Sequence, residues 1–532
     1  MSLVSYLLVT VSQAFRRLRG PAKGEGSPST PPPERSLDLA RLYHALRRDP
    51  LDRVDETTWQ DLAMDEVFQK LDLAVSMPGR QLLYHRLRVL EQDEAVLEEA
   101  TRQYGVLQAE EAWVAKARKL LRRLDNREAA WVPALLMDGL PEGPRHPWIY
   151  YLCGLLPALL LLGGTFWPGL YLGALALVIP NILINEIQGT RMVGHFPALA
   201  QLHGLLRASE ELACLPGAPS LPQVAFLKDH LALMRTLRGR LGILSVDRTR
   251  MAELTAALFG YLNLFFLLDI VAYLRALPAL RRHQGELLQI FEAFGSLDAA
   301  MAVTDYAAGQ PCVTTPVFTS GPHLEVTGLC HPLLATPVGN ALVLQDRSAL
   351  ITGSNMAGKT TFIRAVGINV LLGRTVHLCL ARKALLPKAV VRSSIRRGDR
   401  LLEGQSTYFV ELQRLLEFVR EAGQGVLHLF LIDEIFRGTN TVERVAASIA
   451  VLRHLGQGHL VLVTTHDLEL GQALANGYDL YHFSEQVVDG NCGFDFRLRP
   501  GPARSGNAIK LLELSGYPEA ITREARLLAE GW

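Results

Sequence analysis

The stretch ALITGSNMAGKTTFIR, residues 349–364, determines the class of the C-terminal fold. An apolar run is followed by Gly353, four further residues and then Gly358-Lys359-Thr360, where a helical pattern begins. This spacing between a strand and a helix is typical of a phosphate-binding loop, in which backbone N–H groups and the helix N-terminus surround the phosphates. We expect Lys359 to reach the β- and γ-phosphates and the Thr360 hydroxyl to bind Mg²⁺.

Two later strands end in residues that suit the same chemistry. LHLFLIDEIF, residues 427–436, reads as a buried strand that ends at Asp433, where a Mg²⁺-binding carboxylate is needed. Glu434 is then placed to polarise the attacking water as a general base. HLVLVTTHD, residues 459–467, brings His466 to the end of a third strand, where it can contact the γ-phosphate. A strand ending in two acids is ordinary by itself, but together with the loop this order is typical of an ABC-class ATPase.

These segments resemble those of the MutS family of DNA mismatch repair ATPases. The resemblance rests on Asn355-Met356 within the loop, on DEIFRGT at 433–439, and on GDRLLEGQSTYFVEL at 398–412, which is similar to the family's signature segment. CHPLL at 330–334 and SGNAIKLLELSGYP at 505–518 also match the family pattern. The likeness is strong over 325–520 and extends weakly to most of 67–532.

The resemblance implies a slow, dimer-dependent ATPase that uses ATP and Mg²⁺ as a homodimer, with Asp433 and Thr360 as metal ligands. The signature segment of one subunit would complete the site of the other, so Ser406 and Thr407 would meet the partner's γ-phosphate. Pro337 stands where the family often places an aromatic residue against adenine, while Asn340 still matches. The residues expected to bind ATP are Asn340, Gly353, Ser354, Asn355, Met356, Ala357, Gly358, Lys359, Thr360 and Thr361, and those expected to be catalytic are Glu434, Lys359 and His466.

The chain departs from the family pattern upstream of the ATPase. The segment before residue 67 is too short for a mismatch-reading domain, and the central region is short for a DNA clamp. Apolar residues at three- and four-residue spacing predict an all-α, MutS-core-like lever instead. The expected parts are an apolar and basic segment (1–20), a Pro/Gly/Ser linker (21–36), two lever portions (37–146 and 188–310), an apolar hairpin (147–187) and an α/β ABC-class P-loop ATPase domain with a helical dimerisation tail (311–532).

The hairpin has no charged residue from Trp148 to Asn185, about twice the length that one membrane crossing needs. We expect a transmembrane hairpin of two helices at the cell membrane, although a buried helical hairpin is an alternative. Arg145 and Arg191 flank it, which places both flanks, with the N-terminal part and the ATPase, in the cytoplasm. A second apolar stretch, 254–274, contains Asn263 and Asp269, which favours a long buried helix over a third membrane helix.

The composition sets limits on function. A formal net charge of +1 gives no global basic excess for nucleic acid, and 6 scattered cysteines without a CxxC pair indicate reduced thiols in the cytosol. The favoured interpretation is a membrane-anchored, MutS-related ATPase that acts as a dimeric nucleotide-gated clamp, with DNA binding left open. The alternatives are a soluble MutS-like DNA-binding repair ATPase and a membrane scaffold or signalling ATPase that binds no DNA.

Overall fold

A computed structural model describes residues 34–46, 53–137, 140, 144, 146–192, 196–242, 244, 253–353, 357–395, 407–436, 440–488, 491–502 and 516–530. The chain splits into two compact units, Met1–Asp38 and Leu39–Trp532. The predicted N-terminal segment, most of the linker, Ser354 to Met356 and Ser406 lie outside the described residues.

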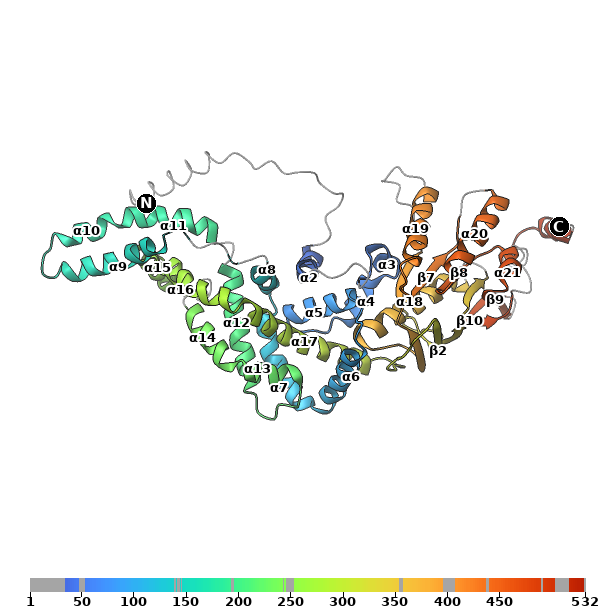
Figure 1. Cartoon of the computed structure of the whole chain (residues 1–532), viewed down its shortest axis with the longest axis horizontal. Coiled ribbons are helices and arrows are strands. Elements are labelled where there is room, and N and C mark those ends of the chain that lie inside the picture. The colour runs from blue at the N-terminus through green and yellow to red at the C-terminus, as the bar shows by residue number, and fades with distance from the viewer. Residues whose placement is uncertain are drawn as a thin grey trace. The chain divides into compact units, whose positions relative to one another are not determined.

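The region before the sheets is helical, as the sequence predicts (Figure 1). Its longest helix, α17 (Gln284–Ala308), is buried along most of its length and packs closely against α5 (Met77–Arg88). A side chain at Gly295 would meet Pro78 O at 2.7 Å. The other helices are α2 (Glu34–Ala45), α3 (Glu56–Asp61), α4 (Met64–Leu71), α6 (Glu94–Ala109), α7 (Glu111–Leu121), α8 (Val132–Met137), α12 (Phe196–Ala213), α13 (Pro222–Asp229), α14 (Leu231–Leu241) and α16 (Leu268–Arg282), with 3₁₀ turns η2 (Arg122–Leu124) and η3 (Arg127–Trp131).

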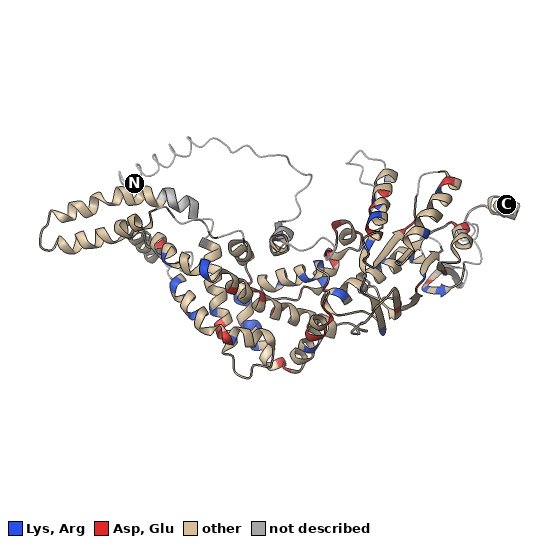
Figure 2. Ribbon diagram, viewed as in Figure 1, with Lys and Arg blue, Asp and Glu red and all other residues tan. Residues whose placement is uncertain are grey.

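The predicted apolar hairpin is helical. It consists of α9 (Pro147–Gly163), α10 (Leu170–Ala176) and α11 (Val178–Met192). Figure 2 shows no Lys, Arg, Asp or Glu on α9 or α10. Many of its large apolar side chains are exposed, among them Trp148, Leu155, Leu159, Leu162, Phe166, Trp167, Leu172, Leu175 and Ile179.

Among the described residues, only α17 is by itself long and apolar enough to cross a membrane, and 72% of its most apolar window is buried, as in a core helix. The bent pair Leu258–Phe266 and Leu268–Arg282 would be a second candidate. The two arms of the hairpin are apolar but shorter than the 18 residues of that test.

The expectation of one long buried helix over 254–274 is wrong. The chain forms α15 (Glu253–Phe266), breaks at Leu267, whose φ is 49°, and continues as α16 at an angle of 65°. The α16 part is largely buried, whereas Leu258, Tyr261 and Leu262 on α15 are exposed. A left-handed leucine, which no sequence pattern announces, therefore separates a core helix from an exposed apolar one.

The described residues of the C-terminal part form two sheets. A four-stranded sheet has the order β1 (Val317–Thr319), β5 (Lys383–Pro387), β2 (His323–Leu329), β3 (Asn340–Gln345). A six-stranded sheet has the order β10 (Asn491–Pro500), β9 (Tyr478–Val488), β4 (Ser348–Thr352), β8 (Leu460–Thr464), β7 (His428–Asp433), β6 (Val390–Ser394). All its neighbours are parallel except β9 and β10, so the carboxyl ends of β4, β7 and β8 meet at one edge. The helices of this part are α18 (Lys359–Val376), α19 (Thr407–Ala422), α20 (Thr441–Leu455), α21 (Leu468–Leu474) and α23 (Glu519–Glu530).

Candidate nucleotide-binding site

The phosphate loop connects β4, which is buried at every position, to α18. Two of its glycines have backbone conformations that disfavour any side chain, with φ of 136° at Gly353 and 99° at Gly358. A Cβ at Gly353 would also lie 2.7 Å from Phe483 O on the neighbouring β9. The loop therefore requires glycine at both positions, as its spacing predicts.

The side chains predicted to hold Mg²⁺ lie together. Thr360 Oγ1 donates a hydrogen bond to Asp433 Oδ2 at 2.8 Å, and Thr464 Oγ1 donates to the other oxygen of the same carboxylate. One hydroxyl and one carboxylate suit Mg²⁺, which completes its shell with water and substrate phosphates. In the part of the chain that the structure describes, no group of three His, Cys, Asp or Glu forms a metal cage. The hydroxyl of Thr360 and the carboxylate of Asp433 therefore fit a Mg²⁺ that arrives with a nucleotide.

Three further predicted residues meet at the same edge. His466 Nε2 lies 3.0 Å from Glu434 Oε1 and 3.2 Å from Lys359 Nζ, and Lys359 also donates to the Gly353 carbonyl. Lys359 is 1% exposed and Glu434 is 8% exposed, so both face the interior of the site. The sheet therefore brings the predicted lysine, general base and histidine into one cluster.

The backbone at Glu434 is unusual. Its φ is 58°, and its N–H donates to Thr464 O at 3.1 Å. Phe436, two residues on, has φ 57° and donates its N–H to Glu411 Oε1 at 2.6 Å. Each such conformation costs roughly 1–3 kcal/mol and recurs at functional sites. These contacts hold the turn that aims the Glu434 carboxylate.

Comparison with known proteins agrees with this geometry. Residues 349–531 match the family model of MutS domain V. From residue 349 on, the chain is therefore similar to the MutS family. It is 28% identical over 262 residues to the DNA mismatch repair protein MutS of Streptococcus sanguinis, covering 46% of this chain and 31% of that protein. It is 31% identical over 269 residues to MutS of Sorangium cellulosum, covering 48% and 29%. The chain thus spans less than a third of the length of these relatives.

Asn340, expected to bind ATP by the MutS resemblance, begins β3 and has its side-chain amide engaged with β10. Its Nδ2 donates to Phe496 O at 3.0 Å, and its Oδ1 accepts from Leu498 N at 2.8 Å. Of the other predicted ATP-binding residues, Ala357 in the loop is buried. Thr361, in the first turn of α18, is half-buried.

Phe496 is a candidate site residue that the sequence does not indicate. It is 45% exposed, has φ 53°, and its ring lies 3.3 Å from the place of a Cβ on Gly358. The register of β9 and β10 shifts between Phe494 and Leu498, which turns this residue toward the MutS-type loop. Phe496 thus places an exposed aromatic ring beside the phosphate loop. The chain has Pro337 at the position where the family often places an aromatic residue.

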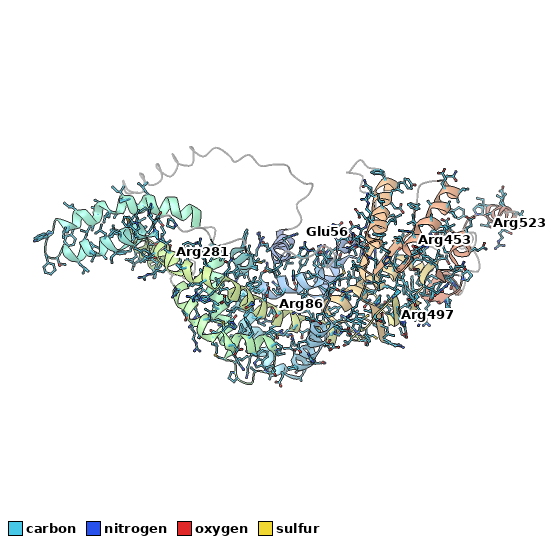
Figure 3. The ribbon with its side chains drawn as sticks, viewed as in Figure 1. Glu56, Arg86, Arg281, Arg453, Arg497 and Arg523 are labelled. Atoms are coloured by element: carbon cyan, nitrogen blue, oxygen red, sulfur yellow. The ribbon has the colours of Figure 1, made fainter. Side chains whose placement is uncertain are left out.

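The signature helix α19 joins the site to the helical region. Thr407 begins this helix, directly after the predicted signature residue Ser406. Arg414 Nη2 donates to Asp55 Oδ1 at 2.8 Å and to Thr58 Oγ1 at 3.1 Å, both at the start of α3. Glu56, which follows Asp55 and is labelled in Figure 3, accepts from Arg88 Nη1 at 2.7 Å. The helix that follows the predicted signature residue Ser406 is therefore bonded through Glu411 to the Glu434 turn and through Arg414 to the helical region.

Proposed function

We propose that the protein binds and hydrolyses ATP as a slow, dimer-dependent clamp that is anchored in the cell membrane. The observation that carries the ATPase part is the convergence of Lys359, Thr360, Asp433, Glu434 and His466 at the carboxyl ends of three neighbouring strands. This is the set of groups that phosphoryl transfer to water requires.

Each group has a separate task in the proposed reaction. The loop N–H groups and Lys359 hold the β- and γ-phosphates, and Glu434 accepts a proton from the attacking water. His466 contacts Glu434 and Lys359, so it holds the Glu434 carboxylate in place. Because it contacts both side chains, His466 also senses whether a γ-phosphate is bound between Glu434 and Lys359. Mg²⁺ bound by Thr360 and Asp433 would neutralise charge on the phosphate oxygens.

The dimer is supported by exposed apolar side chains on α19 and on the tail helix α23. Phe409, Val410, Leu412 and Leu416 on α19 are all exposed, beside the predicted trans-acting Ser406 and Thr407. Ile521, Leu527 and Leu528 on the tail helix α23 are exposed as well. A second copy, closed by ATP and released by hydrolysis, would bury this surface and complete both sites.

Membrane anchorage is supported by the hairpin. No charged residue occurs from Trp148 to Asn185, many large apolar side chains of this segment are exposed, and exposed Phe166 and Trp167 occupy the turn. Such a surface in water would be an aggregation hazard, whereas aromatic residues at a helix end suit a membrane interface. The proposal is a two-helix insertion through 148–185 with both flanks in the cytoplasm.

The proposal is tested on the full chain in native membranes and in detergent. We expect it to stay with membranes in high salt and to leave only with detergent, and extraction by salt alone would contradict the anchor. ATPase activity per molecule should rise with protein concentration, because the site needs a partner, and an activity independent of concentration would contradict the dimer.

Nucleic acid is the point on which the alternatives differ. The curated relatives are named DNA mismatch repair proteins, which makes DNA a second candidate ligand. Measuring the ATPase rate with and without DNA separates the possibilities. Stimulation would favour a DNA-binding clamp, and no response would favour a membrane scaffold or signalling ATPase. Stimulation together with extraction by salt would favour the soluble repair ATPase.

A further inference from the structure

The apolar surface of the hairpin continues onto α15, which begins about 60 residues after α11 ends. No charged residue occurs from Leu254 to Leu268. Gly154 of α9 lies so close to the end of α15 that a Cβ there would be 2.7 Å from Phe266 O. That carbonyl is backbone and cannot move aside, so this approach requires glycine.

One buried side chain ties the three helices together. Asn181 on α11 is 0% exposed, and its Nδ2 donates to Cys153 O of α9 at 3.1 Å and to Phe265 O of α15 at 2.8 Å. Phe265 O is among the last carbonyls of its helix, which have no partner within the helix. The Asn181 amide therefore gives a hydrogen-bond partner to a carbonyl at the C-terminal end of α15.

The break after α15 is closed by a second amide. Asn263 Nδ2 donates to Asp269 Oδ2 at 2.8 Å, and Asn263 Oδ1 accepts from Asp269 N at 2.9 Å. Both residues are buried. Leu267 N donates to Asn263 O at 2.8 Å, so the backbone is bonded through the turn as well. The side chains of Asn263 and Asp269 thus supply polar partners at the break.

The outward face of α15 is apolar. Leu258 is 59% exposed, Tyr261 is 66% exposed and Leu262 is 40% exposed. In water, solvent normally hydrogen-bonds the open backbone groups at a helix break, and the exposed face of a helix is normally polar. Here side chains of the protein bond the backbone at the break, and the exposed face is apolar. That combination suits hydrocarbon, where backbone groups must find internal partners and the surface must be apolar.

We infer that α15 is a third lipid-contacting helix, so that the bilayer meets a unit of α9, α11 and α15 fastened by Asn181. This inference rests on the membrane anchorage proposed above. α16, which follows the break, stays in the core of the helical region, where most of its residues are buried. The lipid-facing boundary then falls at Leu267, between Phe266 and Asp269.

The test uses spin labels on the full chain in phospholipid vesicles. Single labels are placed at Tyr261 on α15, at Leu162 on the hairpin and, as an aqueous reference, at exposed Arg240 on α14. Accessibility to oxygen, which concentrates in lipid, is compared with accessibility to a water-soluble nickel chelate. We expect the labels at 162 and 261 to favour oxygen and the label at 240 to favour nickel.

The outcomes separate the inference from its premise. A lipid-like label at 162 with a water-like label at 261 overturns the third helix and leaves the anchor standing. Water-like labels at both positions overturn the anchor and the inference together. Asn181→Leu, which removes the amide, should raise the mobility of the label at 261 at least twofold, while Asn185→Leu, one turn further along α11, should leave it unchanged. Equal effects of the two variants would refute the fastening role of Asn181.

Discussion

The Nε2 atom of His466 lies 3.0 Å from Oε1 of Glu434, and the same nitrogen is 3.2 Å from Nζ of Lys359. The proposed general base is thus linked through one histidine to the lysine that would hold the γ-phosphate. ATP binding and ATP hydrolysis thus depend on neighbouring but different side chains. A substitution of Glu434 can therefore change hydrolysis without changing binding.

The first prediction concerns Glu434→Gln. The amide keeps the shape of the side chain but cannot accept the proton, so we expect hydrolysis to fall by roughly 10²- to 10⁴-fold. ATP affinity should change less than about threefold, because Lys359 and the loop are intact. Single-turnover hydrolysis and equilibrium nucleotide binding measure the two quantities.

Glu469→Gln is the control for that substitution. Glu469 lies in the first turn of α21, three residues after His466, and its side chain is exposed, so the same change of charge is made on a nearby carboxylate that is not buried in the site. We expect wild-type hydrolysis. If Glu434→Gln also hydrolysed ATP at the wild-type rate, Glu434 would not be the base.

The second prediction concerns the contact between Asp55 and Arg414. The Arg414 side chain is 11% exposed, and Asp55 also accepts from Thr58 N at 3.0 Å as the N-cap of α3. We expect Asp55→Asn to lower the free energy of unfolding by about 1–3 kcal/mol. A double-mutant cycle with Arg414→Gln should give a coupling energy above about 0.5 kcal/mol. Urea denaturation measures both.

The matched control is the exposed pair Glu519 and Arg523 on α23, the latter labelled in Figure 3. Its side chains are 83% and 72% exposed, so the same kind of cycle should give less than about 0.5 kcal/mol. Similar coupling energies for the two pairs would mean that Asp55 and Arg414 do not join the signature helix to the helical region.

The sequence predicts what depends on local spacing. Gly353 and Gly358 are recognisable because a phosphate loop needs glycine at fixed positions within one short segment of sequence. Asp433 and His466 are recognisable because each follows an apolar strand, and parallel strands align their carboxyl ends.

Contacts between distant segments are not readable in the same way. Asn340 meets Phe496 across 156 positions, and a register shift in a hairpin turns that ring toward the loop. The break at Leu267 carries no glycine or proline to announce it. Packing with Asn181 and Gly154 stabilises it, and these are contacts that only the folded chain creates.

The third prediction concerns pH. Burial lowers the pKa of His331 to about 4, and the positive charges of Arg364 and Lys70 act in the same direction. His331 Nδ1 accepts from Leu333 N at 3.2 Å, which requires that nitrogen to be unprotonated. Below pH 6.5 the unfolded chain binds a proton that the folded chain excludes, so stability falls as the pH falls from about 6.5 to 4.

His331→Gln should remove this pH-dependent contribution to the free energy of unfolding. The loss of stability between pH 7 and pH 5 should shrink by at most about 2 kcal/mol, measured by urea denaturation at each pH. Burial raises the pKa of Asp72 to about 6, which acts in the opposite sense, since its stability contribution falls as the pH rises from about 4 to 6. Repeating the comparison in an Asp72→Asn background isolates the histidine. An unchanged pH dependence there would exclude His331 as the source.

The last prediction concerns Phe496. Its exposed ring lies beside Gly358, so a base that follows the phosphates out of the loop can stack on it. Base–aromatic stacking contributes about 1–3 kcal/mol, so Phe496→Ala should weaken ATP binding by roughly 5- to 150-fold. Phe496→Tyr, which keeps the ring, should bind nearly as the wild type does.

A ligand control distinguishes stacking from damage to the loop. Inorganic triphosphate has no base, so Phe496→Ala should leave its affinity within about twofold of wild type if only stacking is lost. The same substitution should also reduce the preference for ATP over triphosphate. Equal weakening of both ligands would instead show that Phe496 supports the backbone at Gly358, because only the phosphates are common to the two.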